Sequence, residues 1–299
     1  MKHTKGQNIN GWLIVDKPIG VTSTYVVNQT RHLFNASKAG HTGTLDPFAS
    51  GVLPIAFGEA TKLIPYVTDG RKEYEFTLKF GAATDTLDPT GRLTAEGHPV
   101  PSVQQITSVL PQFIGSITQT PPLYSAIKIA GRRAYDLARA GLSADIPQRK
   151  INIYNLEFLG LLSDSQAHFR VACSKGTYVR TLGADIAEKL GTVGYLTALR
   201  RTKCGNFSLS DTILLDNLKK QEYIAFEQWL RPLMTCLCDI TVIALSQEEA
   251  LRLRQGQKLS VKGRQLPSSK EAVAVLDGLP IAVVRTDAKA ISPIRVFNL

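Results

Sequence analysis

Residues 40–53 read Gly40-His-Thr-Gly-Thr-Leu-Asp-Pro-Phe-Ala-Ser-Gly-Val-Leu53, and this is the most informative stretch of the chain. Its carboxylate, Asp46, precedes Pro47, which restricts the Asp46 backbone to extended or turn conformations. The surrounding glycines permit tight backbone paths and the close approach of a ligand. Such a loop presents a carboxylate instead of holding it inside a helix. Because Asp-Pro is also ordinary turn chemistry, a plain turn is the alternative.

The tetrapeptide Thr-Leu-Asp-Pro occurs twice, at 44–47 and at 86–89. The second copy continues into Thr90-Gly91 and follows residues 74–80, whose alternating pattern predicts a strand. We therefore expect residues 86–89 to be an ordinary hairpin connection. The first copy is distinguished only by its flanking residues, which are Gly-His-Thr-Gly before it and Ala-Ser-Gly-Val-Leu after it. The tetrapeptide alone therefore identifies no site.

The composition excludes several classes of protein. The chain has 299 residues, 43% hydrophobic and 20% charged, as in an ordinary globular protein. It has neither a run of about 18 apolar residues nor a secretory leader pattern, so we expect no membrane span and no export. The spacing of the cysteines and histidines fits no metal site, and Cys236 and Cys238 indicate free thiols in a reducing cytoplasm. A net charge of +10 favours a polyanionic partner.

The periodicity of apolar residues predicts an α+β protein with two domains. The stretch from residue 240 onward is short and rich in expected strands, with a turn at Asp277-Gly278, and we therefore divide the chain into 1–239 and 240–299. We expect strands at 11–15, 74–80, 169–173, 272–276 and 281–284, and helices from Thr22 or Ser23 to 34 and at 103–114, 181–190 and 245–254.

A basic segment occupies residues 124–150. Its cations alternate with Tyr124 and Tyr135, and only Asp136 and Asp145 oppose them. Single-stranded RNA needs cations for its phosphates and aromatic faces for its splayed bases, so this composition suits RNA. A solvated amphipathic helix with packed tyrosines explains the charge pattern equally well. The cations are Lys128, Arg132, Arg133, Arg139, Arg149 and Lys150.

The segment 40–53 resembles the nucleophile loop of the TruB-type tRNA pseudouridine synthases. Five further segments are similar to motifs of that family and occur in the same order. The residues after 240 resemble, less specifically, the short PUA-like RNA-binding domain of its bacterial members. The five segments are Gly11–Ser23, Lys72–Tyr74, Pro121–Arg139, Gly176–Leu182 and Gly194–Thr202.

The resemblance implies a pseudouridine-synthase fold: a large mixed, mainly antiparallel sheet flanked by helices, with residues 124–150 as a flap and a small β-rich domain at 240–299. It implies isomerisation of uridine to pseudouridine at standard position 55 in the T-loop of tRNA, with no cofactor and no metal. It also implies that the T-arm of tRNA is the partner. We expect a cytoplasmic monomer that requires no protein partner.

The same resemblance assigns roles to individual residues. Asp46 is the nucleophile, and Arg180 keeps it ionised through a bidentate contact. Tyr74 stacks on the flipped-out base, and His41 fills the space that the base leaves. Further substrate-binding positions are Leu199, Tyr178 and Lys17, and the RNA-binding positions of the flap are Lys128, Arg132, Arg133 and Arg139.

Each of these roles has a structural alternative. A lone histidine beside glycines is commonly a hydrogen-bonded loop residue, and Tyr74 and Leu199 equally suit a plain core. Arg180 equally suits a surface ion pair of little energetic value, and Lys17 a structural cation that closes the Lys-Pro turn. Two alternatives concern the function: an RNA-binding folding helper with secondary or no catalysis, and pseudouridylation of another structured RNA such as ribosomal RNA.

Overall fold

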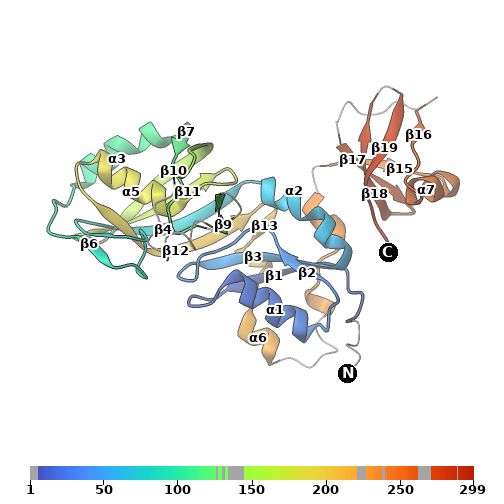
Figure 1. The fold of residues 1–299 in the computed structure, drawn as a ribbon, viewed down its shortest axis with the longest axis horizontal. Helices are drawn as coiled ribbons and strands as arrows, with labels where there is room; N and C mark the ends of the chain where they lie inside the picture. Colours follow the sequence, from blue (N-terminus) through green and yellow to red (C-terminus); the bar gives the residue numbers. More distant parts are fainter. Residues whose placement is uncertain are drawn as a thin grey trace.

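Two β-sheets with helices packed on them make up the protein (Figure 1). The computed structural model describes residues 6–125, 127–129, 132–133, 145–220, 227–237, 240–261, 271–287 and 289–299. The larger sheet has ten strands and the smaller one five, and two short hairpins complete the β structure of these residues. This is the α+β class that the sequence predicts.

The large sheet is mixed and mainly antiparallel. Its strands follow the order β14-β1-β3-β12-β4-β11-β10-β7, with β2 paired to β3 and β13 paired to β12. Only the pairs β1–β14 and β3–β12 are parallel. The bounds are β1 Gly11–Lys17, β2 Ala39–His41, β3 Ser50–Phe57, β4 Lys72–Phe80, β7 Gly115–Gln119, β10 Arg149–Ser163, β11 Gln166–Cys173, β12 Gly194–Cys204, β13 Phe207–Ser208 and β14 Ile213–Leu214.

Strand β1 lies between two cores, because successive side chains of a strand point to opposite faces. Leu13 and Val15 pack in the main core against the helices, whereas Trp12 and Ile14 pack in a second core on the other face. Figure 1 shows α1 and α6 beneath the strands β1–β3, and α3 and α5 beside β4, β10 and β11. The helices are α1 Ser23–Leu33, α3 Val103–Val109, α5 Val179–Lys189 and α6 Leu215–Lys219.

Two helix boundaries have local causes. Helix α1 begins after Thr22, whose side chain accepts a hydrogen bond from the backbone N–H of Tyr25. The helix expected at 103–114 is α-helical only over α3 and continues as the 3₁₀ helix η2 (Leu110–Phe113), because Pro111 lacks the N–H that a longer α-helix needs there. No helix among the residues described above has the length and apolar character that crossing a bilayer requires.

The small sheet rests on the 3₁₀ helix η1 (Gly58–Leu63) and the helix α2 (Ile64–Asp69). Val273, Val283 and Phe297 from this sheet region share the second core with Trp12. Its hairpin turns at Asp277-Gly278, where both residues have positive φ as a type I′ turn requires. The elements are β15 Thr241–Ala244, α7 Gln247–Arg254, β16 Leu259–Ser260, β17 Glu271–Leu276, β18 Leu279–Thr286 and β19 Ala290–Val296.

The predicted flap lies partly outside the described residues, and Tyr135 and Arg139 are among those outside. The described part contains the strands β8 (Lys128–Ile129) and β9 (Arg132–Arg133), which pair antiparallel. For residues 128–129 and 132–133, the alternative of an amphipathic helix is therefore wrong. Whether the flap contacts RNA stays a prediction.

Candidate active site

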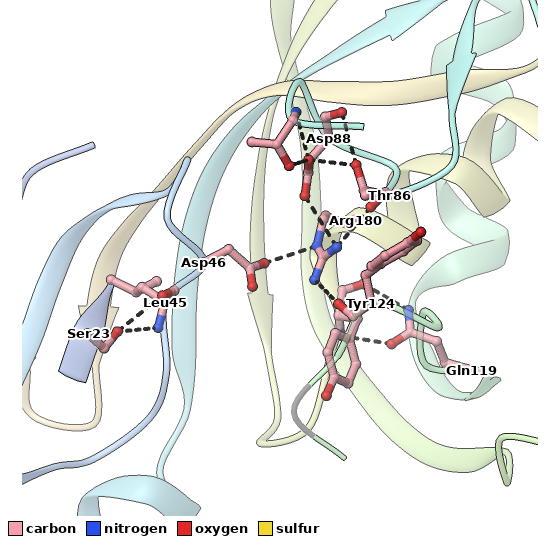
Figure 2. A network of polar contacts seen from close by, with 10 residues as sticks. Ser23, Leu45, Asp46, Thr86, Asp88, Gln119, Tyr124 and Arg180 are labelled. Atoms are coloured by element: carbon pink, nitrogen blue, oxygen red, sulfur yellow. Dashed lines mark hydrogen bonds and ion pairs between the residues drawn. The ribbon is translucent and has the colours of Figure 1, made fainter. Parts of the chain in front are cut away.

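The loop that carries Asp46 connects β2 to β3 and is held on both sides of the carboxylate. On one side, Ser23 Oγ accepts a 2.8 Å hydrogen bond from the Leu45 N–H and donates a 3.1 Å bond to the Leu45 carbonyl (Figure 2). On the other side, the Ala49 N–H donates to the Asp46 carbonyl at 3.0 Å. These contacts fix the backbone, so the Asp46 side chain leaves the loop in a defined direction.

Arg180 faces Asp46 from helix α5 (Figure 2). Its Nε lies 3.0 Å from Asp46 Oδ2, but the N–H direction falls outside hydrogen-bond geometry, so the contact is an ion pair through one nitrogen. The prediction of a bidentate contact is wrong, because the two terminal nitrogens have other partners. Nη1 donates to the Thr86 carbonyl at 2.8 Å, and Nη2 donates to the Tyr124 carbonyl at 2.9 Å.

Asp88 is a second carboxylate on the same arginine. Its Oδ2 lies 3.3 Å from Arg180 Nη1. Its Oδ1 accepts hydrogen bonds from Thr86 Oγ1 at 2.7 Å and from the backbone N–H of Thr90 at 2.9 Å. The second Thr-Leu-Asp-Pro does connect two strands, β5 (Ala83–Thr84) and β6 (Leu93–Ala95). The prediction that it is only a hairpin connection is nevertheless wrong, since its aspartate is buried against Arg180.

The start of helix α5 positions Arg180. Gln119, at the end of β7, accepts a 2.8 Å hydrogen bond from the Tyr178 N–H and donates a 3.1 Å bond to the Tyr178 carbonyl. This side chain supplies the partner that the first turn of a helix lacks within the helix itself. The Arg149 guanidinium lies 5.0 Å from the centre of the Tyr178 ring, within cation–π range. The first turn of α5 is thus anchored to the sheet.

Opposing influences set the protonation of Asp46. The surrounding protein atoms desolvate the carboxylate, and this raises its pKa above the ordinary value of an aspartate. The positive charge of Arg180 lowers the pKa, whereas the negative charge of Asp88 raises it. The Asp46 side chain is still 34% exposed, against 6% for Asp88. Asp46 is therefore the carboxylate that a ligand reaches, and Arg180 favours its ionised form.

Two cavities meet at Asp46 and Arg180, which line both. The smaller has a volume of about 280 Å³ and extends over β4 and β12, where Tyr74 and Leu199 line it. The larger has a volume of about 950 Å³, and its lining includes His41. The cavities separate the predicted site residues into two groups, one on each side of the carboxylate.

Tyr74, Leu199 and Tyr178 all line the smaller cavity. Burial raises the pKa of Tyr74 to about 12, so its phenol is neutral at neutral pH. Leu199 is 7% exposed and also belongs to the main core, so this one side chain forms part of both the cavity wall and the core. The structure thus brings these three predicted residues to one side of Asp46.

His41 lines the larger cavity, at the start of the loop. Its Nδ1 accepts a 3.3 Å hydrogen bond from the Gly43 N–H. Burial lowers the pKa of His41, which favours a neutral ring with its proton on Nε2. His41 is therefore a hydrogen-bonded loop histidine, as the alternative predicted. Its ring also borders the cavity beside Asp46.

Lys17 is a buried cation beneath the loop. Its ammonium donates to the carbonyls of Pro18 at 2.8 Å, Val21 at 2.7 Å and Pro47 at 3.5 Å. Burial lowers the pKa of Lys17 to about 8. Among the described residues that line the two cavities, Lys17 is absent. These contacts fit the structural cation, and the substrate-binding position of Lys17 stays a prediction.

Several residues at the smaller cavity were not singled out from the sequence. Lys72 is buried and donates to three carbonyls at the end of α2, among them that of Thr68. Thr68 Oγ1 in turn donates to the Thr42 carbonyl at 2.7 Å, at the start of the loop that carries Asp46. Arg201 also lines this cavity. The two-residue period of β4 places Lys72 on the face of Tyr74, and this signal was available in the sequence.

The arrangement is suited to nucleophilic or acid–base chemistry by one carboxylate. Asp46 is open to both cavities, is paired with a buried guanidinium and is held by a fixed loop. A carboxylate in this setting can attack an electrophilic carbon or accept a proton from a ligand in the cavity.

Comparisons with known proteins identify a family and several relatives. Residues 31–179 match the N-terminal domain of the TruB family pseudouridylate synthases, and residues 180–238 match the C-terminal domain of tRNA pseudouridylate synthase B. The tRNA pseudouridine synthase B of Rhodospirillum rubrum is 44% identical over 306 residues, covering 100% of this chain and 99% of the relative. That of Gluconacetobacter diazotrophicus is 47% identical over 263 residues, covering 87% of this chain and 86% of the relative.

Solved structures share the fold. A crystal structure of a Cbf5–Nop10–Gar1 complex contains a chain that matches with a TM-score of 0.72 and 25% identity, over 96% of this chain and 84% of that chain. An H/ACA RNP bound to a substrate RNA containing 2′-deoxyuridine matches with a TM-score of 0.72 and 23% identity, over 97% of this chain and 85% of that chain.

Proposed function

The chain belongs to the TruB family of tRNA pseudouridine synthases and is an isomerase that pseudouridylates tRNA; on this premise we propose that it converts the uridine at standard position 55 in the T-loop, with Asp46 as the nucleophile. The observation that carries the proposal is the exposed carboxylate of Asp46 between two cavities, ion-paired at 3.0 Å with the buried Arg180. Tyr74 and Leu199 line the cavity in which the base is received.

The reaction exchanges one bond for another without any redox change. The Asp46 carboxylate attacks C1′ of the ribose, and the C1′–N1 bond breaks with its electron pair remaining on the uracil. The uracil rotates, and an electron pair at C5 forms the new bond to C1′ and releases the carboxylate. C5 then loses its proton and N1 gains one, so substrate and product are isomers. Asp46 is suited to the attack because Arg180 favours the ionised carboxylate.

The base must leave a folded RNA loop before Asp46 can reach its ribose. We propose that Tyr74 stacks on the extruded uracil and that His41, which lines the larger cavity, occupies the space that the uracil leaves. We further propose that residues 124–150 cover the bound T-arm and that residues 240–299 form a separate RNA-binding domain after a catalytic domain of residues 1–239. A monomer in the cytoplasm that needs no protein partner completes the proposal.

The test is Asp46→Asn, which keeps the size and polarity of the side chain but removes its charge. Purified protein is incubated with unmodified tRNA, and pseudouridine is mapped by chemically induced reverse-transcription stops. We expect a stop at position 55 with the unsubstituted protein and none with Asp46→Asn. The affinity for tRNA is expected to stay within a few-fold, because binding rests mainly on phosphate contacts and RNA shape.

The matched control is Asp216→Asn, since the Asp216 side chain is 77% exposed and pairs with Lys219 three residues along helix α6. It should pseudouridylate at the unsubstituted rate. Normal pseudouridine formation by Asp46→Asn would disprove the nucleophile. A protein that binds tRNA but forms no pseudouridine would support the folding helper, and a stop elsewhere than position 55 would correct the substrate.

A further inference from the structure

A buried arginine that no role has yet explained lies at the smaller cavity. Arg201, on β12, is the cross-strand neighbour of Tyr74 on β4, so the two side chains share one face of the sheet. Arg201 lines the smaller cavity together with Tyr74. It is only 1% exposed, and it is one of the largest fully buried side chains in the protein.

The charge of Arg201 has no carboxylate partner among the residues that the structure describes. Its Nε donates to the Val52 carbonyl at 2.7 Å and its Nη2 to the Gly43 carbonyl at 3.2 Å. The side chains that act on it most strongly are those of Cys204 and Tyr74, and the Tyr74 phenol also hydrogen-bonds to the guanidinium. Burying a cation without an opposite charge is strongly unfavourable.

The other buried cations of the site are compensated. Arg180 faces the carboxylates of Asp46 and Asp88. Lys72 has its three N–H groups on carbonyls at the C-terminal end of α2, where the backbone carries partial negative charge. Arg201 differs, because its described partners are two carbonyls on separate segments and the Tyr74 phenol, none of them a carboxylate, for a group with five N–H donors. Its positive potential therefore extends into the smaller cavity.

We propose, resting on the proposed function, that Arg201 stabilises the negative charge that uracil acquires when its bond to the ribose breaks. The electron pair of the C1′–N1 bond remains on the ring, and the charge spreads over N1, O2 and O4 until C5 re-forms a bond to C1′. A fixed cation acts strongly on such a charge, since the cavity is lined by protein and the cation needs no reorganisation. Arg201 acts through the electric field of its guanidinium in the wall of the cavity, so it is an electrostatic and positioning residue.

A purely structural role makes a different prediction. Arg201 joins the nucleophile loop to β3 through the Gly43 and Val52 carbonyls. If this bridge is its whole contribution, removing it displaces Asp46 and slows every substrate by the same factor. If Arg201 stabilises the departing base, the loss depends on how well that base carries negative charge by itself.

The experiment compares Arg201→Gln on two T-arm RNAs, one with uridine and one with 5-fluorouridine at the target position. Fluorine lowers the pKa of the detached base by on the order of one unit, so it needs less help as a leaving group. We measure consumption of the target nucleoside in single turnovers with enzyme in excess. We expect Arg201→Gln to lower the single-turnover rate constant by about 100-fold with uridine. With 5-fluorouridine we expect the decrease to be roughly tenfold smaller.

Two further variants keep the test decisive. Arg201→Met is made beside Arg201→Gln, since a flexible apolar side chain fills a buried space that an amide does not suit. The ratio of the rate constants for the two RNAs does not depend on the folded fraction of a preparation, so a partly folded variant still gives an answer. Arg201→Lys retains the charge, and we expect it to keep the unsubstituted ratio.

The matched control is Arg200→Gln on the same strand. The Arg200 side chain is 40% exposed, and its guanidinium binds the carboxylate of Asp16. It should leave both rate constants near those of the unsubstituted protein. Equal losses on the two RNAs for Arg201→Gln and Arg201→Met would overturn the inference. If the unsubstituted protein forms no pseudouridine from the uridine RNA, the proposed function itself fails, and the two failures are thus distinguishable.

Discussion

At the scale of single residues, one guanidinium connects two aspartates that differ in exposure. Arg180 directs its Nε to Asp46 and its Nη1 to Asp88. Asp88 is fixed by hydrogen bonds from Thr86 and Thr90, whereas Asp46 opens into both cavities. The buried carboxylate therefore holds the arginine, and the arginine favours the charge of the exposed one.

Replacing Asp88 by Asn should reduce pseudouridylation. The substitution removes a negative charge from Arg180 Nη1 and weakens the acceptor for Thr90, so Arg180 loses its orientation toward Asp46. We expect the rate of the chemical step to fall by about tenfold to 100-fold, while tRNA affinity changes little. Single-turnover kinetics and a binding titration measure the two effects. An unchanged rate would show that the Thr86 and Tyr124 carbonyls suffice to orient Arg180.

The pH dependence of the rate should report the ion pair. The pKa of Asp46 is raised by burial and lowered by Arg180, and in the proposed reaction the ionised carboxylate attacks the ribose. The rate should thus fall as the pH drops through this pKa. In Arg180→Met the lowering charge is absent, and we expect the acidic limb to move to higher pH. Single-turnover rates between pH 4 and 9 measure the limb, with Arg180→Lys as the charged control; an unmoved limb in Arg180→Met would contradict the assignment.

At the scale of elements, the close contact of β3 with β12 brings the loop that carries Asp46 to the sheet. The two strands pair in parallel at Arg200–Ser50 and Arg201–Gly51. Gly51 has φ +105°, and a Cβ built there would lie 2.2 Å from the Arg201 carbonyl oxygen. The glycine that follows the nucleophile loop therefore allows the backbones of β3 and β12 to approach.

Gly51→Ala should destabilise the protein strongly. The new methyl group meets rigid backbone, and the positive φ is itself unfavourable for alanine, so we expect a loss of about 3 kcal/mol or more in the free energy of unfolding. Gly97→Ala is the control, since Gly97 has φ +76° but no atom within 4 Å of a built Cβ. Its loss should be about 1 kcal/mol, from backbone strain alone. Urea unfolding of both variants measures the difference, and equal losses would contradict the steric contact.

At the scale of the whole molecule, helix α2 lies between the small sheet and the site. Tyr66 donates to Glu271 of β17 at 2.8 Å, and Lys62 of η1 donates to the Val296 carbonyl of β19 at 2.7 Å. The end of the same helix contacts the nucleophile loop through Thr68, whose hydroxyl donates to the Thr42 carbonyl. Figure 1 shows α2 facing the small sheet, so one short helix contacts both parts of the protein.

The basic flap should account for part of the affinity for tRNA. The chain carries a net charge of +10, and Arg132, Arg133 and Arg139 concentrate positive charge in one segment. Replacing all three by Ala should weaken tRNA binding and reduce the salt dependence of log K by about one per lost phosphate contact.

Titrations at several salt concentrations measure both quantities. The control replaces the exposed cations Lys189, Lys219 and Lys220, which lie outside the described linings of both cavities. We expect this control to bind more tightly than the flap variant, with a steeper salt dependence. The same affinity and slope in the flap variant as in the unsubstituted protein would show that this segment does not contact RNA.

The local sequence predicted the structure correctly where the structure depends on residues close together along the chain. Residues 11–15 lie in a strand, Thr22 begins α1, and Asp277-Gly278 turns a hairpin, each as predicted. These features follow from apolar alternation, from a side-chain cap and from positive φ. The motifs likewise predicted that Asp46 and Arg180 meet. The identical tetrapeptide at 86–89 misled the prediction, because nothing in its neighbours along the chain indicates the arginine that it contacts.

The sequence by itself determined the fold class, the family and the carboxylate at the centre of the site, because these are recorded in the periodicity of the chain and in contiguous motifs. Only the tertiary structure decided that Arg180 contacts Asp46 through one nitrogen and Asp88 through another, that backbone carbonyls bind the Lys17 ammonium, and that Arg201 is buried at the cavity with no carboxylate partner among the described residues. The contacts of Arg180 and Arg201 and the contact of Lys17 with Pro47 join residues 30 to 158 positions apart. Such contacts arise from how strands and helices pack, and a pattern along the chain does not specify which buried charge meets which partner.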